Sequence, residues 1–225
     1  MLFLVDTADL GAIKKCAEYF PIDGVTTNPT IIAREKTEFK KLIRDIRDII
    51  GDDKMLHVQT TATEASEIVK EAEMLKEVVG DNFYIKIPIN AEGLKATEMC
   101  KAKGIGVTMT AIFTQTQALM AAKAGADFVA PYVNRLDNVV ADGVNVVSEI
   151  VEVFDLYGIK TKVLAASFKN VEQVHKVSLT GAQSVTINPE LFEMLIYHPL
   201  TDHAIDGFTK DWQNVYGDKK VSDLL

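Results

Sequence analysis

The chain has 225 residues, of which 48% are hydrophobic, enough for one sizeable core in one domain. Its net charge of −8 and pI near 5.1 argue against a nucleic-acid partner, because no basic block is available to contact phosphates. No apolar run approaches the roughly 20 residues that span a membrane, and the first residues lack the basic stretch of a signal peptide. Two well-separated cysteines suggest a reducing compartment, so we expect a cytoplasmic globular protein.

Short apolar runs alternate with amphipathic segments along the whole chain. The apolar runs predict strands over 2–5, 25–27, 55–59, 82–89, 106–110, 128–131, 162–165 and 184–187. The amphipathic segments predict helices over 7–20, 37–50, 63–79, 92–102, 114–124, 144–157, 171–180 and 189–197, with a last helix over 202–216. This alternation requires parallel strands joined by right-handed crossovers.

Eight strand–helix units of about 28 residues each are sufficient for a (β/α)8 TIM barrel. We therefore predict one barrel domain over 1–225, with an additional C-terminal helix over 202–216. The alternative is a doubly wound open sheet, which commonly binds a dinucleotide. Neither a Gly-x-Gly-x-x-Gly turn after the first strand nor a phosphate-cradling Gly-Lys-Ser/Thr loop is present, so the barrel is favoured.

Lys86 is an anomaly, because it interrupts the apolar run that predicts the fourth strand. Burying an ammonium group without a partner is costly, and such a group tends to lose its proton. A lysine on an edge strand would reach water instead, but a closed barrel has no edge. A helix-facing lysine would place its charge in an apolar layer, so the lumen is favoured. Because a neutral lysine in a dry pocket attacks carbonyl groups well, we expect Lys86 to form a Schiff base.

Polar residues follow the apolar interiors of most predicted strands. They are Asp6, Asn28, Gln59, Lys86, Thr110 and Ser167, with Tyr132 and Arg135 after the sixth strand. Active sites of (β/α)8 barrels lie at the carboxyl ends of the strands, so we expect these side chains near the lysine. Strand ends are also where any chain becomes polar, so Asn28 or Ser167 alone carries little weight. A guanidinium beside a hydroxyl, as in Arg135 and Ser167, suits a phosphate group and indicates a phosphorylated sugar.

Segments spread along the whole chain fit one known family. They are Val5-Asp6-Thr7-Ala8, Gly24-Val25-Thr26-Thr27-Asn28-Pro29-Thr30, Ile85-Lys86-Ile87-Pro88, Ala130-Pro131-Tyr132-Val133-Asn134-Arg135, Ala165-Ala166-Ser167-Phe168, His198-Pro199-Leu200-Thr201-Asp202 and Asp211-Trp212. In this order they resemble the small transaldolase and fructose-6-phosphate aldolase family. The resemblance implies a class I aldolase on a (β/α)8 barrel that needs no metal and no organic cofactor.

The resemblance also implies a role for each candidate residue. Lys86 would be the Schiff-base nucleophile, and Asp6 would hold the substrate hydroxyl at C4 and remove its proton. The water that moves protons near the lysine would be positioned by Gln59, Thr110 and Tyr132. Contacts with the substrate's hydroxyls and phosphate would come from Thr26, Asn28, Arg135 and Ser167.

Two positions separate the subtypes of this family. Transaldolases have a glutamate at the end of the third strand and a phenylalanine after the sixth, whereas fructose-6-phosphate aldolases have glutamine and tyrosine. With Gln59 and Tyr132, this chain is similar to the aldolase subtype, which reversibly cleaves fructose 6-phosphate to dihydroxyacetone and glyceraldehyde 3-phosphate. An amide in place of a carboxylate removes a base, and a phenol can supply the lost proton transfer.

The same residues also fit other interpretations. Tyr132 also fits a packed aromatic at the barrel mouth. A transaldolase that transfers a dihydroxyacetone unit between sugar phosphates, as in the pentose phosphate pathway, is the main alternative function. A non-catalytic barrel used for binding is a remote one.

The predicted C-terminal helix carries an apolar stripe that a barrel does not need, made of Phe208, Trp212, Val215 and Tyr216. The stripe covers either its own barrel or, as the resemblance implies, a neighbouring subunit in pentameric rings that pair into decamers. The expected partners are therefore sugar phosphates, dihydroxyacetone and further copies of this chain.

Overall fold

The computed structural model describes residues 1–225, which divide into two compact units, Met1–Phe192 and Glu193–Leu225. The first unit is a closed barrel, because eight parallel strands pair in chain order and β1 also pairs with β8. The strands are β1 (Leu2–Asp6), β2 (Gly24–Thr26), β3 (Met55–Gln59), β4 (Phe83–Pro88), β5 (Gly106–Ile112), β6 (Phe128–Pro131), β7 (Lys162–Ala165) and β8 (Ser184–Ile187). The predicted barrel is confirmed, and the open sheet is excluded.

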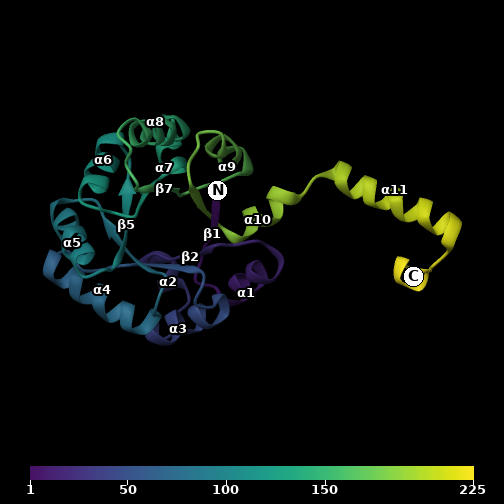
Figure 1. Cartoon of the computed structure of the whole chain (residues 1–225), viewed down its shortest axis with the longest axis horizontal. Helices are drawn as coiled ribbons and strands as arrows, with labels where there is room; N and C mark the ends of the chain where they lie inside the picture. Colours follow the sequence, from purple (N-terminus) through teal and green to yellow (C-terminus); the bar gives the residue numbers. More distant parts are fainter. The chain divides into compact units, whose positions relative to one another are not determined.

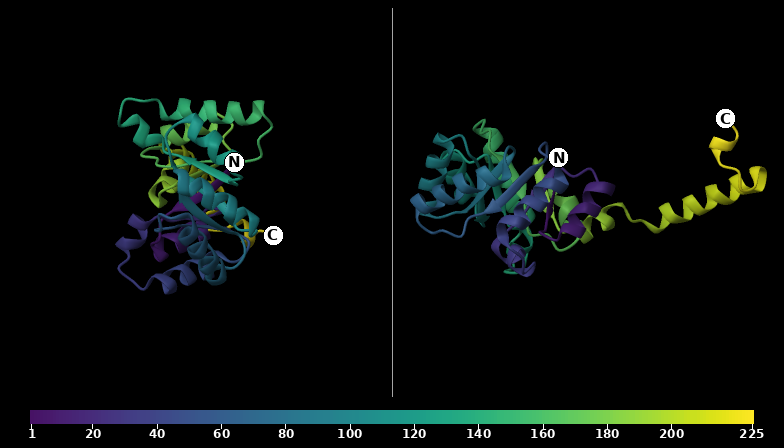
Figure 2. Two further views of the ribbon diagram at one scale, coloured as in Figure 1. Left: turned by 90° about the vertical axis from the view of Figure 1, so that its left-hand side faces the viewer. Right: turned by 90° about the horizontal axis from the view of Figure 1, so that it is seen from below.

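Helices surround the strands of this unit (Figures 1 and 2). They are α1 (Leu10–Tyr19), α2 (Pro29–Arg34), α3 (Phe39–Ile50), α4 (Ala65–Val79), α5 (Ala91–Ala102), α6 (Gln115–Lys123), α7 (Val133–Asp137), α8 (Gly143–Leu156), α9 (Val171–Ser178) and the start of α10 (Pro189–Ile196). In α3 the buried side chains recur at helical spacing as Leu42, Ile43, Ile46 and Ile50, which explains its packing on the barrel. The short helices α2 and α7 were not predicted.

Alternate residues of each strand face either the helices or the barrel lumen. In β4, Phe83, Ile85 and Ile87 belong to the main core shared with the helices. Tyr84 instead packs against a small cluster that includes Leu4, Phe128 and Leu164, which lie inside the barrel. Because Lys86 is two residues after Tyr84, it also projects into the lumen, where it is only 5% exposed. This is the orientation expected from the sequence.

The second unit consists of the end of α10, helix α11 (Pro199–Tyr216) and a 3-10 turn over Val221–Asp223. Helix α11 begins three residues before its predicted start. Pro199 occupies its first turn and the His198 side chain accepts a hydrogen bond from the Leu200 N–H, so both residues favour this earlier start. None of the helices in the chain combines the length and the apolar character needed to cross a membrane.

Candidate active site

Lys86 lines a hollow of about 470 Å³ at the carboxyl ends of the strands. Its Nζ donates a hydrogen bond to the backbone oxygen of Thr27 at 2.9 Å. This bond uses only one hydrogen of the amino group. Five further residues singled out from the sequence line the same hollow: Asp6, Asn28, Tyr132, Arg135 and Ser167. The structure therefore gathers around the lysine residues that are up to 161 positions apart in the sequence, from Asp6 to Ser167.

Asp6 is held by a threonine on the neighbouring strand. Asp6 and Thr26 are paired across β1 and β2, and Thr26 Oγ1 donates to Asp6 Oδ1 at 2.7 Å. Thr26 itself is fully buried and does not line the hollow. The bond uses Oδ1, so Asp6 can offer Oδ2 to a substrate hydroxyl. In this structure Thr26 acts on Asp6 rather than facing the hollow directly.

Asn28 stabilises a helix start and also lines the hollow. It is the N-cap of α2, and its Oδ1 accepts a hydrogen bond from the Ile31 N–H at 3.0 Å. Pro29 follows in the first turn, where its missing N–H costs nothing. The cap fixes the orientation of the side chain and leaves the amide nitrogen as a donor for a substrate oxygen.

Tyr132 lines the hollow from the position directly after β6, where it is the N-cap of α7. The Tyr132 hydroxyl lies 3.0 Å from Thr110 Oγ1. The ring of Phe113 packs edge-on against the Tyr132 ring, with the two centroids 5.5 Å apart. Thr110 is fully buried in β5, next to an irregularity in the β5–β6 pairing where Ala111 has a positive φ of 58°. Such irregularities re-aim side chains near functional sites.

Arg135 and Ser167 are brought together by backbone hydrogen bonds between α7 and the loop after β7. The Val133 N–H donates to the Ala166 oxygen at 2.9 Å, and the Asn134 N–H donates to the Ser167 oxygen at 2.7 Å. Ser167 has φ +62°, a left-handed conformation that is costly for a residue other than glycine and is often found at functional sites. Together these features hold a guanidinium and a hydroxyl at one edge of the hollow.

The short helix α7 is itself anchored by its neighbours. Asp137 accepts hydrogen bonds from the Gly143 N–H at 2.9 Å and from Gln173 Nε2 at 2.6 Å. A side chain at Gly143 would lie 2.4 Å from the Val133 oxygen, so only glycine allows α8 to begin this close to α7. Arg135 therefore belongs to a helix, α7, whose position is fixed by contacts with its neighbours.

Gln59 is placed differently from the other candidates. It is the Cα partner of Lys86 across β3 and β4, but it lines two adjoining hollows and not the one that contains the lysine. The loop after it is fixed by Glu71, whose carboxylate accepts hydrogen bonds from Thr60 Oγ1, the Thr61 N–H and Thr61 Oγ1. Burial tends to raise the pKa of Glu71, but these hydrogen bonds prevail and lower it.

His57 lies in the lumen, although it was not predicted as a site residue. It is fully buried, its Nδ1 lies 2.8 Å from Thr108 Oγ1, and its ring stacks on Tyr84 with centroids 4.7 Å apart. Burial, with a smaller contribution from the charge of Lys86, holds the pKa of His57 well below its ordinary value of 6.5. A neutral imidazole therefore lies in the lumen, close enough to Lys86 for the lysine's charge to affect its pKa.

The eighth strand and the residue after it also contribute to the hollow, although no site residue was predicted there. Thr186 and Asn188 line the hollow, as do Phe168 and, at the end of α2, Arg34 and its C-cap Glu35. A signal for two of them was present, because Thr186 and Asn188 continue the period of two that begins at the buried Ser184.

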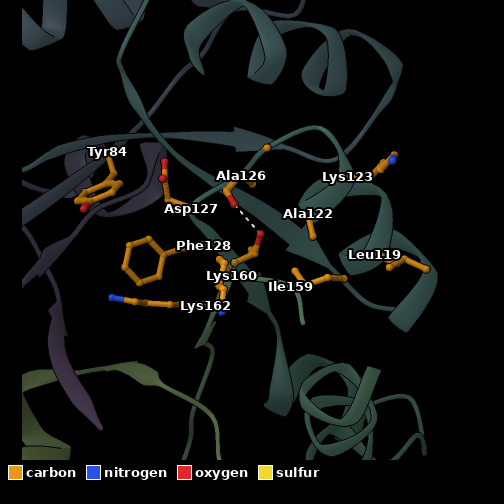
Figure 3. A pocket seen from close by; sticks show the side chains of 12 residues that line it. Tyr84, Leu119, Ala122, Lys123, Ala126, Asp127, Phe128, Ile159, Lys160 and Lys162 are labelled. Atoms are coloured by element: carbon orange, nitrogen blue, oxygen red, sulfur yellow. Dashed lines mark hydrogen bonds between the residues drawn. The ribbon is translucent and has the colours of Figure 1, made fainter. Parts of the chain in front are cut away.

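A second hollow, of about 520 Å³, lies at the opposite, amino-terminal ends of β6 and β7 (Figure 3). Its lysines diverge: Lys123 points away from the others, while Lys162 Nζ lies 5.7 Å from the Phe128 ring centroid. Its acid, Asp127, is already paired with Lys101 at 2.7 Å. Nowhere in the chain are three or more His, Cys, Asp or Glu side chains grouped so that they could hold a metal ion. The hollow around Lys86 is therefore the stronger candidate site.

Comparisons with known proteins show the family of the chain. The family model described as Transaldolase/Fructose-6-phosphate aldolase matches residues 3–219. A "Probable transaldolase" from Symbiobacterium thermophilum is 40% identical over 96% of this chain and 99% of its own, and a "Probable fructose-6-phosphate aldolase" from Streptococcus pneumoniae is 38% identical over 98% and 100%. A solved structure described as "Native KDPGal structure" shares the fold, with a TM-score of 0.60 and 16% identity over 88% of this chain and 84% of its own.

Proposed function

Because the chain belongs to the transaldolase/fructose-6-phosphate aldolase family, we propose that it is a Schiff-base aldolase that reversibly cleaves fructose 6-phosphate to dihydroxyacetone and glyceraldehyde 3-phosphate. Membership of this family makes the chain an enzyme, which removes the non-catalytic barrel from consideration. One observation carries the proposal: a lysine that is 5% exposed shares a hollow with a carboxylate, a phenol, a guanidinium and a hydroxyl. We place the enzyme in the cytoplasm.

The reaction begins at the lysine. The neutral amine of Lys86 attacks the C2 carbonyl of the open-chain ketose, and the resulting carbinolamine loses water to give a protonated imine. Arg135 and Ser167 hold the phosphate with charge-assisted and neutral hydrogen bonds, and Asn28 donates to a hydroxyl of the substrate. A water molecule near Tyr132, Thr110 and Gln59, as the resemblance to the family implies, would carry the protons that this step requires.

Bond cleavage then uses Asp6. Asp6 removes the proton of the C4 hydroxyl, the C3–C4 bond breaks, and its electron pair moves to the imine to form an enamine. Glyceraldehyde 3-phosphate leaves with a carbonyl at the former C4. Proton transfer through Tyr132 and the water returns a hydrogen to the enamine carbon, and hydrolysis releases dihydroxyacetone and restores Lys86.

The experiment that tests this function supplies fructose 6-phosphate alone and measures free dihydroxyacetone and glyceraldehyde 3-phosphate. An aldolase releases both in equal amounts without an added acceptor. Failure to release dihydroxyacetone would reject the aldolase proposal. In the released-product assay, Gln59→Glu should reduce dihydroxyacetone release, since it restores the residue that the transaldolase subtype has at this position.

Transaldolase activity is the second candidate, favoured by the relatives named "Probable transaldolase" at 40% and 41% identity. This activity uses the same lysine but passes the three-carbon enamine to a second sugar phosphate instead of releasing it. The two activities differ when erythrose 4-phosphate is added. A transaldolase forms a seven-carbon ketose phosphate only with that acceptor, and it leaves fructose 6-phosphate intact without it.

We further propose that α11 binds a neighbouring copy of the chain in a pentameric ring, and that rings can pair into decamers. The proposal is supported by exposed apolar side chains that recur along α11: Leu200, Ile205, Phe208, Val215 and Tyr216. The helix is also well formed at its end, where Trp212 Nε1 donates to the Lys219 oxygen and the Trp212 ring lies 4.5 Å from that of Tyr216.

A further inference from the structure

Asp6 is the end of a chain of hydroxyl groups that crosses three strands. Thr26 Oγ1, on β2, donates to Asp6 Oδ1 at 2.7 Å and lies 2.6 Å from Thr186 Oγ1, on β8. β2 and β8 are the two neighbours of β1 in the closed barrel. Thr26 is fully buried and Thr186 is 3% exposed, so water competes little for these bonds.

The direction of this chain follows from the number of hydrogens available. A hydroxyl has one hydrogen to donate, and an ionised carboxylate can only accept. Thr26 donates its hydrogen to Asp6, so it can meet Thr186 only as an acceptor. Thr186 must therefore donate to Thr26, and all the hydrogens of the chain point towards Asp6.

We propose that Thr186 is a positioning residue for Asp6, and that it acts through the hydroxyl of Thr26. By donating to Thr26, it holds the Thr26 hydroxyl in the one rotamer that binds Asp6 Oδ1. Threonine suits this task because its branched side chain has few χ1 rotamers. With Oδ1 held in this way, Oδ2 is the oxygen presented to the C4 hydroxyl of the substrate.

This inference rests on the proposed function, and it predicts an effect on one step only. Removal of the C4 proton requires a correctly placed Asp6. Dihydroxyacetone has no C4, so the exchange of its carbon-bound hydrogens through the Lys86 imine does not need that step. Loss of the Thr186 hydroxyl should therefore slow cleavage but not exchange, whereas a general disturbance of the barrel would slow both.

The experiment compares four proteins: the wild type, Thr186→Val, Thr186→Ser and the control Thr161→Val. Thr161 is also a buried threonine, whose hydroxyl donates to the Ala126 oxygen at 2.7 Å, but it lines the hollow at the opposite end of the barrel. Two rates are measured for each protein: kcat for fructose 6-phosphate cleavage, and exchange of dihydroxyacetone hydrogens in heavy water by proton magnetic resonance. Thermal unfolding establishes that each variant is folded, and Thr186→Ala replaces the valine variant if that one does not fold.

We expect Thr186→Val to lower kcat for cleavage about tenfold, the effect of losing roughly one neutral hydrogen bond, without changing the exchange rate. Thr186→Ser, which keeps the hydroxyl, should cleave at nearly the wild-type rate, and Thr161→Val should leave both rates unchanged. In a Thr26→Val background the Thr186→Val change should have no further effect. Equal slowing of cleavage and exchange, or slowing of neither, would overturn the proposal while the proposed function stands. A wild type that exchanges no hydrogens would overturn both.

Discussion

The Cζ atom of Arg135 lies 4.6 Å from the centroid of the Tyr132 ring, so the guanidinium rests over the face of the phenol. The hydroxyl of the same tyrosine lies 3.0 Å from Thr110 Oγ1. One aromatic ring therefore joins the proposed phosphate-binding residue to the proposed proton-transfer group. This contact allows the two functions to be tested separately, because each side chain can be changed while the other partner is kept.

Tyr132→Phe should slow the release of dihydroxyacetone from fructose 6-phosphate about 100-fold, because a positioned acid–base group typically contributes this much. The phenylalanine ring keeps the contacts with Arg135 and Phe113, so the loss is confined to the hydroxyl. The measurement is the rate of dihydroxyacetone formation at saturating substrate. An unchanged rate would mean that Tyr132 is only a packed aromatic.

Arg135→Ala should raise KM for fructose 6-phosphate about 10- to 100-fold, since hydrogen bonds to charged groups contribute roughly 1.5–3 kcal/mol. The effect on unphosphorylated fructose should be much smaller. Lys160→Ala, which removes an exposed positive charge at the other end of the barrel, is the matched control and should leave both values unchanged. Equal losses for the two sugars would argue against a phosphate contact.

The sequence was sufficient to locate the strands, because each is a short apolar run between turn residues. It did not reveal α2 or α7, which are too short to show a helical period. A signal for α2 was available in Asn28 followed by Pro29, which form its cap and first residue but were interpreted as the end of a strand.

Once the strands are located, part of the site around Lys86 can be predicted from the residues at their ends. Strand ends in a barrel meet at one face, so Asp6, Tyr132 and Arg135 could be assigned to one site before their contacts were known. The pairing of Thr26 with Thr186, 160 residues apart, could not be predicted, because it depends on the register at which the barrel closes. The contact of His57 with Thr108 depends on a different part of the barrel, namely the registers of β3 with β4 and of β4 with β5.

The buried His57 makes a prediction about pH. Its pKa is lowered in the folded state, so below pH 6.5 the unfolded chain binds more protons at this residue and the folded state loses stability as pH falls. The free energy of unfolding of wild type relative to His57→Gln should therefore decrease by about 1.4 kcal/mol for each pH unit below 6.5 until the folded-state pKa is reached. Urea unfolding at pH 7, 6 and 5 measures this, with the exposed His175→Gln as control. A difference independent of pH would contradict a neutral buried imidazole.

The helix α11 makes a prediction about assembly. Removing the residues after Asp202 deletes the exposed apolar side chains of Phe208 and Val215 and should convert the proposed ring to smaller species. Light scattering after size-exclusion chromatography measures the mass of both proteins. If the shortened chain has the same number of subunits as the full chain, α11 does not join the copies.

Trapping the proposed imine on Lys86 is the most direct test of Schiff-base catalysis in this enzyme. The wild type is incubated with dihydroxyacetone and sodium borohydride, and the modified peptide is identified by mass spectrometry. We expect one reduced three-carbon adduct on Lys86, loss of activity in proportion to its formation, and no adduct in Lys86→Met. An enzyme that cleaves fructose 6-phosphate but carries no adduct at Lys86, or carries it on another lysine, would contradict Schiff-base catalysis by Lys86.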